Sequence, residues 1–257
     1  MGTVLLYFMI SLLASIIGAI AGIGGGVFIK PTLDFLGDYP LATIGILSSM
    51  TVFTMSTISL WTRRREVKVM DKATSIFLAL GAVLGGLMGK VFFKSLLTFS
   101  WVGNVQTIAL IIIFSTVLIY VQFKDKFPSF FIENRAVIFG MGLALGLLSA
   151  FLDIGGGPHN IALLSLFFAM DAKESSLYSL FIICFSQVSA LLYTFISTDL
   201  STFDFTMLPG MMVGGVLGGA IGSNFSKWFT IKGVEIVFKL SLVGLVLLNI
   251  YNLYLYL

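Results

Sequence analysis

Two runs of glycine interrupt the apolar stretches of this sequence. The first is Gly22-Ile23-Gly24-Gly25-Gly26, with Pro31 beyond it, and the second is Asp153-Ile154-Gly155-Gly156-Gly157-Pro158-His159-Asn160, about 131 residues later. Glycine destabilises a helix by about 1 kcal/mol relative to alanine and proline by about 3 kcal/mol, so neither run continues a helix easily. In hydrocarbon, broken backbone persists only inside protein or beside a polar cavity, because each unpaired N–H or C=O group costs several kcal/mol. Two such breaks at matching places predict a binding site.

The class of protein follows from the scarcity of charge. Hydrophobic residues make up 58% of the chain and charged residues 11%, whereas a soluble domain is about 25% charged. The apolar segments run to about 20 residues without alternation, which favours membrane helices over barrel strands. We therefore predict an all-α polytopic membrane protein. The single cysteine, Cys184, forms neither an internal disulfide nor a CxxC site, and we expect no cofactor, no metal and no nucleic-acid partner.

The apolar segments occur in the same order in two halves. In the first half they cover residues 3–23, 27–36, 41–61, 73–93 and 105–123, and in the second half 136–152, 161–170, 177–196, 205–225 and 234–255. We predict residues 1–126 as one membrane repeat, 127–135 as a connector and 136–257 as a second repeat. Small residues at four-residue spacing let a neighbouring helix approach closely. The two matching series are Gly81, Gly85, Gly89 and Gly214, Gly218, Gly222.

The loops indicate that the halves are inverted. The loop from Arg63 to Lys72 is the most basic, which places it in the cytoplasm, whereas the equivalent loop contains only Asp199 and Asp204 as charges. If these loops lie on opposite sides, each half crosses the bilayer an odd number of times. Three full spans per half give this odd number. The glycine-broken element is then either a re-entrant hairpin or two tilted spans. In this arrangement both termini lie outside. Eight plain spans with parallel halves are the alternative.

Both glycine runs have the chemistry of an anion site. Successive backbone N–H groups in a glycine-rich turn form a concave nest for anions, and a helix that begins there adds about half a positive charge. We predict that these groups bind a small oxyanion at Gly24, Gly25, Gly26, Gly155, Gly156 and Gly157. The alternative is that the glycines only permit a tight helix crossing.

Few ionisable residues lie within the predicted membrane zone. They are Lys30, Asp34, Lys90, Asp153, His159 and Lys239. Lys30 either counters the charge of the anion or reaches the outer interface, and we interpret Lys90 and Lys239 as snorkelling side chains. Asp153 and His159 flank the second glycine run and are candidates to carry a coupling proton, with an internal polar contact as the alternative.

Polar side chains near the glycine runs complete the candidate set. His159 and Asn160 follow the second run, and Ser48 and Ser179 lie on the spans after the two hairpins. We predict all four as substrate-binding residues. For the two serines, polar contacts between packed helices are the alternative.

The paired Gly-x-Gly-Gly-Gly segments, in a duplicated apolar chain of this length, resemble those of the sulfite exporter TauE/SafE family. The resemblance covers essentially the whole chain. It implies a secondary transporter for sulfur-containing anions such as sulfite, sulfonates or sulfoacetate, coupled to protons, in a bacterial cell (inner) membrane. The second copy departs from the first: Asp153 takes the position of Gly22, and Ala162 stands where Pro31 predicts a proline. We therefore expect the first run mainly to bind the anion and the second both to bind it and to sense protons.

Other classes of function are less consistent with the residues. The chain contains no HExxH, no GxSG and no Asp-rich diphosphate motif, so we do not expect an enzyme. A passive anion channel is the nearer alternative, because backbone nests can line a pore. A carrier of another small carboxylate or oxyanion also stays open, as do the direction of transport and the oligomeric state, including a homodimer.

Overall fold

The protein is described by a computed structural model that covers residues 2–97, 99 and 101–256. Within those residues the chain forms eleven α-helices and two short 3-10 turns. The bounds are α1 (Gly2–Ala21), α2 (Gly26–Leu36), α3 (Leu41–Thr62), α4 (Arg64–Val67), α5 (Lys72–Leu96), α6 (Val102–Gln122), α7 (Arg135–Phe151), α8 (Pro158–Phe168), α9 (Ala172–Ser197), α10 (Leu208–Trp228) and α11 (Ile231–Tyr256). The predicted all-α class is confirmed.

Six of the described helices are long and apolar enough to cross a membrane. They are α1, α3, α5, α6, α9 and α11. The glycine-rich α10 is not among them, although its 21 residues are about 31 Å long and match the thickness of the hydrocarbon core. The two helices next to the second glycine run, α7 and α8, are shorter. The chain is therefore a multi-pass membrane protein.

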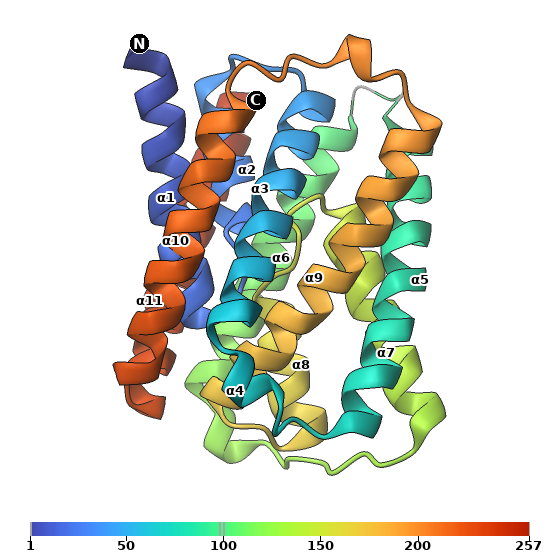
Figure 1. Cartoon of the computed structure of the whole chain (residues 1–257), viewed down its shortest axis with the longest axis vertical. Coiled ribbons are helices and arrows are strands. Elements are labelled where there is room, and N and C mark those ends of the chain that lie inside the picture. Colours follow the sequence, from blue (N-terminus) through green and yellow to red (C-terminus); the bar gives the residue numbers. More distant parts are fainter. Residues whose placement is uncertain (1, 98, 100, 257) are drawn as a thin grey trace.

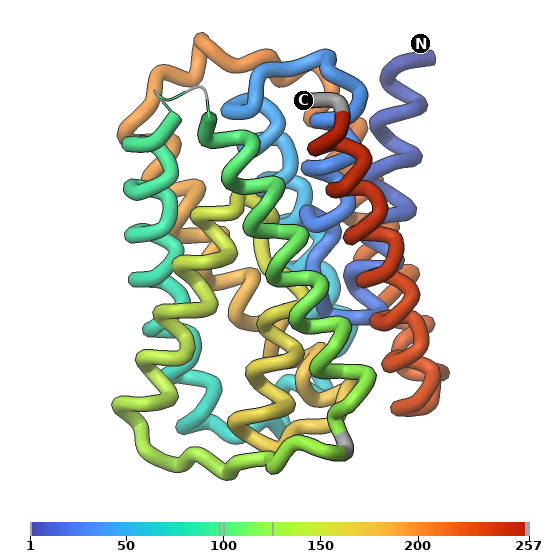
Figure 2. The backbone as a smooth tube through the Cα atoms, turned by 180° about the vertical axis from the view of Figure 1, so that it is seen from behind, coloured from blue at the N-terminus to red at the C-terminus, as the bar shows by residue number. Residues whose placement is uncertain are grey.

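Each glycine run turns the chain back on itself inside the bundle. From the end where the chain begins, α1 runs inward, and after residues 22–25 α2 returns toward that end (Figure 1). The α7–α8 pair enters from the opposite end and also returns to it (Figure 2). Both α2 and α8 have 11 residues, about 16 Å, or half of the hydrocarbon thickness. The chain thus turns back at both glycine runs, although α1 is itself long enough to cross a membrane.

The two hairpins share their backbone turns although their residues differ. Gly22 has a φ of +75° and Gly37 of +69°, in the left-handed region that glycine adopts without strain. At the corresponding places in the second half, Asp153 has a φ of +56° and Ala169 of +51°. A non-glycine residue in this region costs about 1–3 kcal/mol, which the surrounding packing must supply.

Pro31 does not help to break the helix, contrary to the expectation from the sequence. It lies inside α2, which continues to Leu36. Because α2 begins at Gly26, proline removes only the one hydrogen bond that its N–H would make to the carbonyl of the previous turn. The carbonyl of Pro31 accepts a hydrogen bond from Asn252 Nδ2 at 2.8 Å. The break is thus made by the glycines alone.

Glycine ladders bring helices of different halves into close contact. Gly85 of α5 faces α7, where a Cβ atom would lie 2.1 Å from the carbonyl oxygen of Leu143. Gly218 of α10 faces α1, where a Cβ would lie 2.6 Å from that of Leu12. Helix α5 packs on α7, and α10 packs on α1. The long helices α3 and α9 contact each other, α3 also contacts α1 and α10, and α9 also contacts α5, α7 and α1. The predicted close approach along both ladders is therefore present.

The connecting segments gather at two ends of the bundle. The loop that contains α4 and the connector at 123–134 lie at one end (Figure 1). The loop at 198–207, the start of α1 and the end of α11 lie at the other end (Figures 1 and 2). The most basic loop and its acidic counterpart are therefore separated by the length of the helices.

Candidate functional site

The two glycine breaks meet inside the bundle. A Cβ atom on Gly26 would lie 2.1 Å from the carbonyl oxygen of Ile154, and one on Gly24 would lie 3.8 Å from that of Gly155. The 2.1 Å approach at Gly26 leaves room for glycine alone, whereas 3.8 Å at Gly24 is an ordinary contact distance. Of the predicted site residues, Gly24, Gly26, Gly155 and Gly156 lie at this crossing, whereas Gly25 faces Ser15 of α1.

Two aliphatic side chains pack against the crossing. A Cβ on Gly155 would lie 2.6 Å from Val52 of α3, and a Cβ on Gly156 would lie 2.1 Å from Ile183 of α9. Both side chains are fully buried. The crossing is therefore closely packed in this conformation.

The backbone of both breaks is rich in free donors. Among the described residues, the N–H groups of residues 23–27 and of 155–157 donate no hydrogen bond. Gly25 and Gly157 are the N-caps of α2 and α8, and neither has a side chain to accept from the first turn. The positive ends of two helices thus begin at the crossing.

Asp153 is held in a buried ion pair beside the second break. Lys90 Nζ of α5 lies 2.6 Å from Asp153 Oδ1, and Ser49 Oγ of α3 donates to the same oxygen at 3.3 Å. Asp153 is 1% exposed, and its Oδ2 has no hydrogen-bond partner in the part of the chain that is described. The interpretation of Lys90 as a snorkelling side chain is therefore wrong, because its amine turns inward to this carboxylate.

Lys30 also lies at the second break. Its amine donates to the Gln106 side chain at 2.7 Å and to the carbonyl of Leu152 at 2.6 Å. Gln106 in turn donates to the carbonyl of Phe151, so the last turn of α7 is capped by two side chains. Lys30 is on α2, the helix that follows the first break, but its amine contacts the second break. The side chain is 4% exposed and does not reach the outer interface.

Of the other predicted side chains, Asn160 and Ser179 contact each other, whereas His159 lies away from them. Asn160 Nδ2 donates to Ser179 Oγ at 3.3 Å, and both side chains are fully buried. Ser48 is also buried, and its hydroxyl has no partner among the described residues. His159 instead lies in a groove of about 440 Å³ between α6 and α8, and neither of its ring nitrogens has a partner in the described chain.

A third cation, Arg63, is buried on the side of the first break. Arg63 is 2% exposed although it begins the most basic loop. Its guanidinium donates to Glu66 at 2.7 Å and to Ser176 Oγ at 3.2 Å. Ser176 in turn contacts Gly22, where a Cβ would lie 2.5 Å from its hydroxyl oxygen. The crossing thus has a buried cation toward each end of the bundle.

Sequence reasoning did not select two residues that shape the second break, Gln106 and Gly45, and it did not assign Lys90 to the site although Lys90 is one of the few ionisable residues in the membrane zone. Gln106 could have been noticed as a rare polar group in an apolar helix. Gly45 carries no such signal, because its part is to leave room for the Asp153 carboxylate.

Comparison with known proteins places this chain in a family. Residues 7–250 match the family described as "Sulfite exporter TauE/SafE". The chain belongs to the TauE/SafE family. It is also 24% identical over 266 residues to the "Probable membrane transporter protein YunE" of Bacillus subtilis (strain 168), an alignment that covers 92% of this chain and 94% of that protein. No solved structure matches the chain.

Membership in the TauE/SafE family confirms the resemblance inferred from the glycine runs. It makes the protein a membrane transporter and not an enzyme. The family description names an anion, sulfite, which is consistent with a site built from backbone N–H groups and buried cations.

Proposed function

We propose that this protein is a secondary transporter of small sulfur-containing anions, such as sulfite, sulfonates or sulfoacetate. The anion is held near the membrane midplane by backbone N–H groups of the two glycine breaks, Gly24 to Gly26 and Gly155 to Gly157. The observation that carries the proposal is the meeting of two helix N-termini whose first N–H groups donate no hydrogen bond within the described residues. Oxyanion oxygens are acceptors for such donors.

The side chains around the breaks complete this site. Asn160, Ser179 and Ser48 supply buried polar groups on the helices next to the crossing. Lys30 adds a positive charge beside Leu152, which favours an anion at the second break. Asp153 is the proposed proton-coupling group, since a buried carboxylate that loses Lys90 must bind a proton. His159, a candidate for both coupling and binding, would act from the groove between α6 and α8.

The two halves, residues 1–126 and 136–257, are proposed to be inverted repeats joined by the 127–135 connector. Support comes from the equivalent turns at Gly22 and Asp153, and from the two ladders, each of which packs on the first helix of the other half. The hairpins also enter from opposite ends of the bundle (Figure 2). With the basic loop 63–72 in the cytoplasm, both termini lie outside the cell membrane.

Access to the proposed site requires a change of conformation. Val52 and Ile183 fill the space beside the glycines, so an anion enters only when one of the hairpins moves relative to α3 or α9. Inverted repeats that open toward one side at a time are the general solution for carriers. The close packing favours a carrier over an open channel.

The test is uptake of labelled sulfite into proteoliposomes. A carrier gives flux that saturates with sulfite concentration and responds to an imposed pH gradient. Single-channel currents from the same preparation would show a passive channel instead. Labelled carboxylates of similar size, used as competitors, decide whether the site selects sulfur-containing anions.

A further inference from the structure

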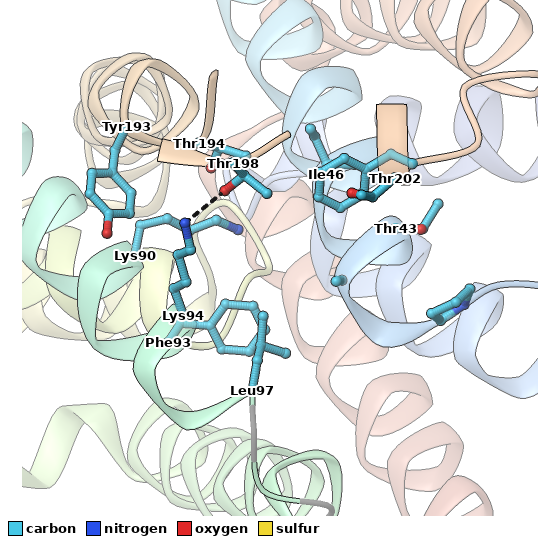
Figure 3. A pocket seen from close by; sticks show the side chains of 13 residues that line it. Thr43, Ile46, Lys90, Phe93, Lys94, Leu97, Tyr193, Thr194, Thr198 and Thr202 are labelled. Carbon is cyan, nitrogen blue, oxygen red and sulfur yellow. Dashed lines mark hydrogen bonds between the residues drawn. The ribbon is translucent and has the colours of Figure 1, made fainter. Parts of the chain in front are cut away.

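A cavity separate from the glycine crossing opens near the acidic end of the bundle. Its volume is about 320 Å³, and it lies between the start of α3, the last turns of α5 and α9, and the turn at 200–203. We call this cavity the vestibule. Lys90 and Lys94 line it from α5, and Thr43 and Ile46 of α3 lie across from them (Figure 3).

The polar wall of the vestibule suits a small anion. Lys94 Nζ donates to the carbonyl and hydroxyl oxygens of Ser197. It also donates, at 3.1 Å, to Thr198 Oγ1 (Figure 3). The ring of Tyr193 lies 5.8 Å from the same amine. Because Lys94 follows Lys90 by one helical turn, both lysine side chains line one side of the cavity. Lys90 is paired with Asp153, whereas Lys94 forms no ion pair within the described residues, and its positive charge in a partly enclosed space attracts an anion of a few atoms.

Lys90 connects the vestibule to the second glycine break. The Lys90 side chain lines the cavity, yet its amine is 2.6 Å from Asp153, whose carboxylate is almost fully buried. One amine is thus within reach of both the cavity and the carboxylate at the break.

The groups that face Asp153 decide what happens when Lys90 leaves it. Ser49 and Gly45 of α3 contact the carboxylate, and Lys90 is its ion-pair partner. Lys30 of α2 interacts electrostatically with Asp153, but its amine is engaged by Gln106 and Leu152, and Asp34 lies near it. A buried carboxylate left with one long hydrogen bond from a serine is strongly destabilised as an anion.

We propose that the vestibule is an anion-binding site in which the bound anion takes Lys90 from Asp153, so that Asp153 binds one proton from water for each anion bound. The anion then replaces the Asp153 carboxylate as the negative partner of Lys90, and the proton neutralises Asp153. The net charge of Lys90, Asp153 and the anion together equals that of the original ion pair. This inference deepens the proposed transport function, because it places anion and proton together in front of the glycine crossing.

Calorimetry of the purified protein tests the proton count. Methanesulfonate, which does not titrate near neutral pH, is added in buffers of different ionisation enthalpy. We expect close to one proton taken up per anion, and an apparent Kd that rises about tenfold per pH unit where Asp153 is ionised. Asp153→Asn should bind the anion without proton uptake and with a Kd independent of pH. Binding to the native protein without proton uptake would overturn the proposal.

A pair of lysine variants tests the location. Lys94→Met should weaken methanesulfonate binding at least tenfold, whereas Lys72→Met, at the exposed start of the same helix, should not change it. Equal affinities of the two variants would reject the vestibule as the site. Because Lys90→Met leaves Asp153 unpaired and can impair folding, Lys90→Met/Asp153→Asn, which removes both charges, should also lose binding.

Failure of this inference is distinguishable from failure of the transport function. If native proteoliposomes carry no sulfonate or sulfite but the binding results hold, the transport proposal fails alone. If flux is present and Lys94→Met and Asp153→Asn behave as the native protein, the vestibule proposal fails alone.

Discussion

The Asp153 carboxylate lies against the α-carbon of Gly45, in the space that any side chain at position 45 would need. A Cβ atom on Gly45 would be 1.6 Å from Asp153 Oδ2. The other half has the converse arrangement, in which Gly22 lies against Ser176 of α9. Each contact joins a hairpin turn to the long helix of the other half, but the glycine is on the helix in one case and on the turn in the other. Only the first arrangement places a carboxylate at the break.

Gly45→Ala tests this contact. The added methyl group must displace the carboxylate from Gly45 and weaken its pairing with Lys90, and overpacking of this kind costs about 1–3 kcal/mol. We expect a lower melting temperature in detergent and a changed pH dependence of sulfite uptake. Gly244→Ala in α11 is the matched control, because a Cβ there meets nothing within 4 Å. Native stability and pH dependence in Gly45→Ala would show that the contact is dispensable.

The crossing of the two breaks gives a second matched pair of variants. In Gly26→Ala the new Cβ would lie 2.1 Å from the Ile154 carbonyl, so the hairpins must separate and uptake should be lost. In Gly25→Ala it would lie 3.2 Å from Ser15 Oγ, and this hydroxyl has no partner among the described residues and can rotate away. We expect Gly25→Ala to keep most of the uptake. Equal uptake by the two variants, measured at equal protein per liposome, would exclude the crossing as part of the site.

Much of the helix arrangement could be predicted from the sequence, because glycines in apolar segments indicate helix ends and close helix contacts. The breaks at Gly22 and Asp153 and the ladder at Gly81 mark where helices end and where they touch. The predicted bounds of the longer helices are close to the observed ones, since apolar segments and charged loops alternate along the chain.

The contacts inside the site could not be predicted in the same way. Lys90 and Asp153 are 63 positions apart, and nothing in either neighbourhood indicates that their helices meet. Arg63 belongs to a loop whose basic composition predicts solvent exposure. Its side chain is nevertheless buried, and it donates a hydrogen bond to Ser176, 113 positions away. Pairings of this range depend on how the two halves pack, which the order of apolar segments does not specify.

The start of α5 gives a prediction about pH. Asp71 is its N-cap, and the Thr74 N–H donates to Asp71 Oδ2 at 2.6 Å, a bond that holds the pKa of the Asp71 carboxyl below its usual value. A lowered folded-state pKa stabilises the protein above the unfolded-state pKa, and this stabilisation is lost as the pH falls through the folded-state value. Asp71→Ala should lose about 1 kcal/mol near neutral pH, as for other N-caps.

Asp71→Asn is the control for that prediction, because asparagine caps a helix as well as aspartate but does not titrate. Its melting temperature should match the native protein near pH 7 and should fall less than the native value between pH 5 and pH 3. If Asp71→Asn and the native protein lose stability equally on acidification, the charge of this cap makes no contribution.

The sidedness of the two ends can be measured by labelling single cysteines. Val69, which is 84% exposed in the basic loop, and Ser201 in the opposite loop are each replaced by cysteine in a Cys184→Ser background. A membrane-impermeant maleimide added to intact cells should label Ser201→Cys and should label Val69→Cys only after permeabilisation, because the positive-inside rule predicts that the basic loop faces the cytoplasm. The Cys184→Ser protein alone should stay unlabelled. Labelling of both loops from the same side would defeat the inverted arrangement of the halves, since that arrangement requires equivalent loops to face opposite compartments.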